Sequence, residues 1–125
     1  MRIEAETPRN ILIMVAFVAA TIVMQMVAAR DGTADGGGGL RPLTDAFDSD
    51  DRPLLNALSR RLEGRTARQK NPHPPDSLAF ATWVCARLGG WTGYYGKPGP
   101  VVILSGWIEF QTLKRGAKLV QNGIV

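Results

Sequence analysis

Side chains able to do chemistry are scarce in this sequence of 125 residues, which holds one cysteine and one histidine. The single cysteine, Cys85, excludes an intrachain disulfide and a zinc cluster built on thiolates. The histidine, His73, stands among prolines, and no second histidine or cysteine lies near it in the sequence to share a metal. No nucleophile–base pair is present either. The sequence therefore predicts a function based on packing or on partners rather than an active site.

Two segments rich in glycine or aspartate also lack the residues that a binding loop needs. Four glycines at positions 36–39 are not followed by the Lys-Ser/Thr pair of a phosphate-binding loop, so we interpret them as a linker. A calcium loop counted from Asp48 needs glycine at its sixth position and glutamate at its twelfth, but the chain has Pro53 and Ser59 there. The acidic residues around Asp48 are more typical of a helix N-terminus.

Charge is unevenly distributed along the chain. Residues 1–51 hold four arginines and eight acids, a net charge of −4, whereas residues 52–125 hold eleven basic residues and three acids, a net charge of +8. A basic C-terminal half suits contact with a polyanion such as DNA. On the charge alone, the alternative of an ordinary solvated surface is the favoured interpretation.

The longest apolar run covers residues 11–29, where only Thr21 and Gln25 are polar. Its length is close to that of a membrane-spanning helix, and a signal peptide is a further alternative. The leader before it has no net positive charge, and the run is rich in alanine, which favours a helix buried inside a protein. Thr7 as N-cap and Pro8 at the first helical position predict that this helix covers residues 8–30.

Three more helices are predicted from capping residues and apolar spacing. The first begins near Pro53 and ends near Gly64, and the second follows Asp76 or Ser77 and stops at Gly89. The last covers residues 101–121 after Pro100. No segment reads as a convincing strand, so we expect an all-α fold: a long N-terminal apolar helix, a Gly-rich linker, a short helix and a C-terminal helical hairpin.

One helix face and two glycines matter for packing in this hairpin. Leu78, Ala81, Cys85 and Leu88 fall on one face of the first hairpin helix. Gly106 and Gly116 lie inside the second, where glycine costs about 1 kcal/mol against alanine but allows close approach of another backbone. Cys85 is expected to act as a small buried hydrophobe.

The hairpin resembles the C-terminal region of bacterial cut-and-paste transposases of the transposon-five and insertion-sequence-four group. In that family a helix ends in a Leu-Gly-Gly-Trp stop, a short loop with proline follows, and a helix with a Trp-x-x-hydrophobic pattern comes next. The matching residues here are Leu88, Gly89, Gly90, Trp91, Pro98, Pro100, Gly106, Trp107 and Phe110. The N-terminal segment, Arg-x-Glu-x-x-Thr before a long apolar helix, is similar to the same family.

The resemblance implies a division of the chain and a role without catalysis. Residues 1–30 would be a helix at the end of the catalytic core, residues 31–52 a Gly/Asp-rich linker, and residues 53–125 a helical dimerisation domain. The family cuts DNA with two aspartates and a glutamate that hold Mg or Mn, and the glutamate signature of that site is absent from this sequence. We therefore expect a non-enzymatic C-terminal fragment that needs no cofactor.

The resemblance also implies which residues contact partners. The dimer contact is expected on the last helix, at Leu104, Trp107, Ile108, Gln111 and Thr112. The alternative is that these side chains pack only against the preceding helix. The resemblance makes Arg2 and Arg9 candidate DNA contacts, whereas Arg60 and Arg61 are candidates because of their charge density and match no motif of the family.

The expected partners are a second copy or the full-length transposase, in the cytoplasm, with transposon-end DNA bound weakly or only by the parent protein. A membrane is not the expected partner. The alternative function is that of a small membrane-anchored or secreted protein that uses the helix at residues 11–29. If no other domain covers that helix, we expect poor solubility or association.

Overall fold

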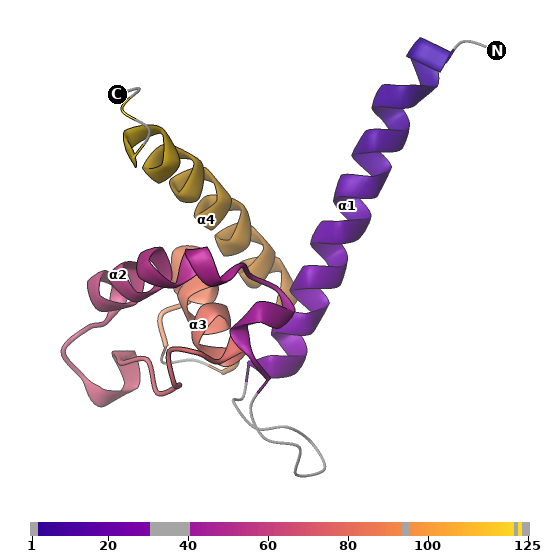
Figure 1. Cartoon of the computed structure of the whole chain (residues 1–125). Coiled ribbons are helices and arrows are strands. Elements are labelled where there is room, and N and C mark those ends of the chain that lie inside the picture. Colours follow the sequence, from indigo (N-terminus) through magenta and orange to yellow (C-terminus); the bar gives the residue numbers. More distant parts are fainter. Residues whose placement is uncertain (1–2, 31–40, 94–95, 122, 124–125) are drawn as a thin grey trace.

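The computed structural model describes residues 3–30, 41–93, 96–121 and 123. Within them the chain is helical, and its one β-type pairing is an isolated antiparallel bridge between Pro42 and Ser77. This confirms the predicted all-α class. The helices are α1 (Ile3–Ala29), α2 (Arg52–Leu62), α3 (Leu78–Leu88) and α4 (Pro100–Gln121), with short 3-10 helices at Leu43–Asp45, Ser49–Asp51 and Ala67–Gln69. Figure 1 shows α1 and α4 diverging from a base that contains α3.

Helix α3 is the centre of the fold, and its ends follow the predicted signals. The Ser77 hydroxyl accepts a hydrogen bond from the Phe80 N–H at 3.2 Å, so Ser77 is the N-cap. The helix ends at Leu88, and Gly90 adopts a φ of 106° that favours glycine. Every residue from 78 to 86 is buried. The sequence predicted one buried face, but α1, α2, α4 and the turn at Leu43–Asp45 cover α3 from several sides.

The hairpin of α3 and α4 is closed by two glycines. A methyl group on Gly106 would overlap the carbonyl oxygen of Cys85, and one on Gly89 would overlap the carbonyl oxygen of Val102. The two backbones therefore touch where the helices cross, which confirms the close approach expected of an interior glycine at Gly106. Around Gly116 a methyl group would meet only open space, so that glycine serves no such contact.

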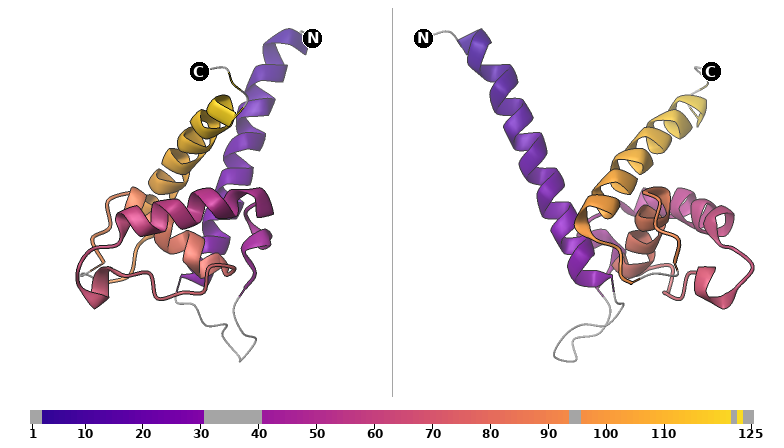
Figure 2. Two further views of the ribbon diagram at one scale, coloured as in Figure 1. Left: turned by 60° about the vertical axis from the view of Figure 1, so that its left-hand side comes forward. Right: turned by 180° about the vertical axis from the view of Figure 1, so that it is seen from behind.

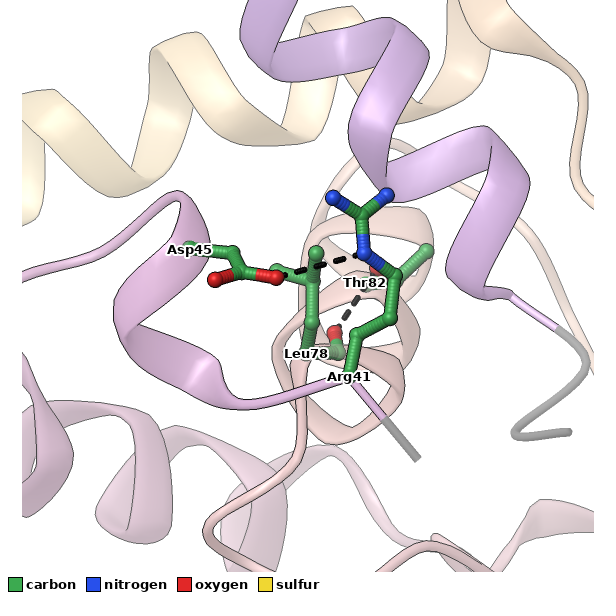
Figure 3. A network of polar contacts seen from close by, with 4 residues as sticks. All are labelled: Arg41, Asp45, Leu78 and Thr82. Carbon is green, nitrogen blue, oxygen red and sulfur yellow. Dashed lines mark hydrogen bonds and ion pairs between the residues drawn. The ribbon is translucent and has the colours of Figure 1, made fainter. Parts of the chain in front are cut away.

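Residues 41–51 contribute to the core. Leu43 is fully buried, and the Phe47 ring meets the Phe110 ring edge-on with their centroids 5.5 Å apart. Figure 3 shows this segment beside α3, with the Arg41–Asp45 ion pair and the hydrogen bond from the Thr82 hydroxyl to the Leu78 carbonyl oxygen. The C-terminal part of the predicted linker at residues 31–52 thus packs into the helical body. Residues 31–40 lie outside the described residues.

Two helix boundaries differ from the sequence prediction. Helix α1 begins at Ile3 and continues through Thr7 and Pro8, although a proline inside a helix leaves one backbone hydrogen bond unmade. Helix α2 ends at Leu62, since Glu63 is extended and the Gly64 N–H donates instead to the Gln69 carbonyl oxygen at 3.1 Å. Gly64 is therefore not the cap of α2.

A buried ion pair fixes the C-terminal half of α4 to the start of α2. The Lys114 ammonium lies 2.9 Å from a carboxylate oxygen of Asp51, whose side chain is 4% exposed, and 3.6 Å from Asp48. Asp51 also accepts a hydrogen bond from the Asp48 N–H at 3.2 Å. The hydrogen bond to Asp51 is the main reason why the pKa of Lys114 is raised above its ordinary value of 10.5.

We expect Lys114→Met to lower the free energy of unfolding by about 1–3 kcal/mol, because it leaves the buried Asp51 carboxylate without its cation. Urea unfolding followed by tryptophan fluorescence measures this. The exposed Lys118 makes no ion pair among the described residues, so Lys118→Met is the control and changes little. Equal losses in both variants would contradict this role.

Since the folded pKa of Lys114 is raised, the stabilisation that Lys114 provides is present at neutral pH and is lost as pH rises through that raised value.

Candidate docking surface between the first and last helices

The N-terminal part of α1 exposes apolar side chains in every direction. Consecutive helical positions are about 100° apart, so an unbroken apolar run covers the whole circumference of the helix. A helix that is apolar all round normally lies inside a protein or a membrane. The exposed residues are Ile11, Leu12, Ile13, Met14, Val15, Phe17, Val18 and, further along, Met24.

The C-terminal end of α1, in contrast, is fixed in the core. Val23, Met26 and Ala29 are buried, and the Thr82 hydroxyl donates a hydrogen bond to the Met26 carbonyl oxygen at 3.4 Å. Arg30 donates from its guanidinium to the Pro98 carbonyl oxygen at 2.8 Å. Figure 1 and the right-hand view of Figure 2 show α1 extending from this base, with its N-terminal half diverging from α4.

Two apolar hollows lie between α1 and α4. One, of about 350 Å³, is lined by Trp107 of α4 and by α1 residues that include Ile11, Val15 and Val18. The other, of about 470 Å³, is lined by Val101 and Leu104 of α4 and by a different set of α1 residues, among them Ala16, Ala20, Val23 and Met24. We call these two hollows, with the exposed residues of α1, the apolar cleft.

The predicted dimerisation residues divide between exposed and half-buried positions on α4. Leu104, Ile108 and Thr112 are exposed, and Trp107 and Gln111 are half-buried. The side of α4 that packs into the core carries instead Ile103, Gly106 and Phe110. Leu104 and Trp107 line the apolar cleft, so the alternative that all five pack only against α3 does not describe them. The α1 side of the cleft was not among the predicted sites, although its all-round apolar run is visible in the sequence.

The candidate DNA contacts lie on separate elements. Arg60 and Arg61 are neighbours in the last turn of α2, and both are exposed. Arg9 is exposed on α1, and Arg2 lies outside the described residues. None of Arg9, Arg60 and Arg61 has an ion pair within the described part of the chain.

The structure offers little for metal or thiol chemistry in the described ranges. No group of three or more His, Cys, Asp or Glu side chains gathers there in a way that could hold a metal ion. Cys85 is fully buried, and burial raises the pKa of its thiol far above the ordinary value because the thiolate is poorly solvated. Cys85 therefore packs as a small apolar residue, as the sequence predicted.

Comparison with known proteins gives no match to a family model, a curated protein or a solved structure. The stretch Arg9–Ala29 of α1 is long and apolar enough to cross a membrane, and 11% of its most apolar window is buried inside the fold. The apolar stretch of α1 and the apolar cleft are the basis for a functional proposal.

Proposed function

We propose that these residues are the C-terminal, dimer-forming part of a cut-and-paste transposase of the transposon-five and insertion-sequence-four group. Its contribution to DNA transposition is the association of protein copies through the apolar cleft. The observation that carries the proposal is the all-round apolar surface of α1 next to the exposed Leu104 and Ile108 of α4. Such a surface is stable in water only when another element covers it.

The residues that carry the family resemblance support the same proposal, because they are concentrated in one structural unit. Leu88 to Trp91 form the end of α3 and the turn after it, and Gly106 is the crossing point with α4. The hairpin presents Trp107 towards α1 as part of the cleft. A second copy, or a full-length transposase with the same hairpin, is the proposed partner.

The anchored end of α1 favours a protein partner over a bilayer. Residues 9–22, before the first buried position at Val23, extend about 21 Å along the helix axis, whereas a hydrocarbon core is about 30 Å thick. To span it, the helix would have to withdraw Val23, Met26 and Ala29 from the core. Each fully buried Val or Met side chain contributes about 1.5–3 kcal/mol, so spanning would weaken the fold.

Sedimentation velocity of the purified chain over a range of concentrations tests the proposal. We expect dimers or small oligomers whose dissociation constant rises at least about tenfold in Val15→Glu and Val101→Glu, since each substitution places a charge in the cleft. The control is Val120→Glu, which changes a valine that is 62% exposed near the end of α4 and outside both hollows. A monomer at all concentrations, or equal weakening by the control, would contradict association through the cleft.

The second candidate is a membrane anchor, favoured by the length and composition of Arg9–Ala29. Flotation with phosphatidylcholine vesicles distinguishes the two functions. Under the association proposal the chain stays with the soluble oligomer when vesicles are added. Flotation of the wild-type chain, abolished by Val15→Glu, would assign α1 to a bilayer instead.

A further inference from the structure

A small pocket of about 190 Å³ lies at the C-terminal end of α1. It is formed by the end of α1, the segment before α3, α3 itself and the turn that leads to α4. Its walls include Arg30, Lys70, His73, Trp83, Trp91 and Pro98. The pocket shares no lining residue with the apolar cleft.

The charged side chains that line this pocket are all basic. Arg30 and Lys70 line it, and no aspartate or glutamate does. One guanidinium N–H of Arg30 donates to the Pro98 carbonyl oxygen at 2.8 Å, and an arginine has five such donors. Lys70 is exposed and makes no ion pair among the described residues. The pocket therefore provides donors and positive charge for an anionic group.

The remaining walls are aromatic and apolar. Trp83 is 5% exposed, and the Arg87 guanidinium carbon lies 5.7 Å from the centre of its ring. Arg87 is fixed there because it also donates to the carbonyl oxygens of Leu62 and Trp91, at 2.6 Å and 2.9 Å. Trp91 is half-buried at the edge of the pocket. Because Trp83 is nearly covered, the half-buried Trp91 offers the more accessible indole surface, and indole rings stack on nucleobases.

The segment that leads into the pocket is also basic. Arg60, Arg61 and Arg65 are exposed and have no ion pair within the described residues, and they precede Lys70 in the chain. Proteins bind single strands by combining basic residues that contact the phosphate backbone with aromatic side chains on which unpaired bases stack.

We propose that this pocket binds a nucleotide, with the base against the tryptophan wall and the phosphate at Arg30 and Lys70. The nucleotide is either free or part of a single strand whose phosphates contact Arg60, Arg61 and Arg65. The proposal does not depend on association through the apolar cleft, so either can fail without the other.

Quenching of tryptophan fluorescence in the full chain tests this, with a twelve-residue oligothymidylate, thymidine monophosphate and inorganic phosphate as probes. We expect the oligonucleotide to bind, with an affinity that falls as salt is raised. Lys70→Glu should weaken binding at least about tenfold, and Trp91→Leu about fivefold or more. The matched control is Lys118→Glu, an equal charge change on α4, which should have less than a threefold effect.

Circular dichroism of each variant verifies that it is folded, and the two pocket variants test different walls. Binding of the monophosphate as tightly as the oligonucleotide supports a free nucleotide, and tighter binding of the oligonucleotide supports a strand. Equal weakening by Lys70→Glu and Lys118→Glu, equal quenching by inorganic phosphate, or no quenching by any probe would overturn the proposal.

Discussion

Gly106→Ala should destabilise the protein by about 3 kcal/mol, a large effect for the addition of one methyl group. The added carbon would overlap the carbonyl oxygen of Cys85 and lie 2.9 Å from the backbone nitrogen of Gly89. Both neighbours are backbone atoms, one in α3 and one at its C-cap, so neither is a side-chain atom that can rotate away. The two helices must separate, and the contacts of Ile103 and Phe110 with the core loosen. The free energy of unfolding in urea measures the loss.

The matched control for this substitution is Gly116→Ala on the same helix. Nothing lies within 4 Å of a methyl group at that position, so only the intrinsic preference for alanine acts, and we expect stabilisation of up to about 1 kcal/mol. The two variants should therefore change stability in opposite directions. Stability changes of the same sign would show that α3 and α4 do not touch at Gly106.

Phe110→Ala is expected to cost about 3–5 kcal/mol, because it leaves a cavity in the centre of the core. The Phe110 side chain is fully buried, and its ring packs edge-on against Phe47 at 5.5 Å with an interplanar angle of 81°. The loss removes the ring contact between residues 41–51 and α4, and leaves the Lys114–Asp51 ion pair between them in place. Thermal unfolding by circular dichroism should show a much lower midpoint.

Ile108→Ala is the control for the core substitution, since Ile108 lies two residues away on α4 and is 54% exposed. At a concentration where the chain is monomeric, we expect a change below about 1 kcal/mol. A comparable loss in both variants would mean that the exposed side of α4 is as important for the monomer fold as its buried side.

The sequence predicts this fold best where local chemistry decides the structure. Ser77, Gly89 and Pro100 act through bonds and dihedral angles within a few residues, and they mark the ends of α3 and the start of α4 correctly. The all-round burial of α3 could not be predicted in the same way. It depends on Leu43, Phe47 and α1, which are distant in sequence and have no local pattern that specifies where they pack.

In the candidate site, too, the features set by local sequence could be predicted and those set by distant contacts could not. Leu104 and Ile108 are four residues apart, so their shared position on α4 can be read from helical spacing. Trp107 lines a hollow together with Ile11 and Val18 because the first and last helices lie beside each other. The residue spacing within one helix cannot predict that pairing. The nucleotide pocket likewise joins Arg30, Lys70 and Trp91 from three parts of the chain.

The unequal attachment of the two cleft helices has a consequence for the order of binding events. Helix α4 is held at two separated points, the Gly106 crossing and the Lys114–Asp51 ion pair, so its exposed surface is presented in one orientation. Helix α1 is held only at its C-terminal end. A partner that first contacts α4 meets a preorganised surface and loses little entropy there, whereas fixing the N-terminal half of α1 carries the larger ordering cost. We therefore expect a partner to contact α4 first and the N-terminal half of α1 afterwards.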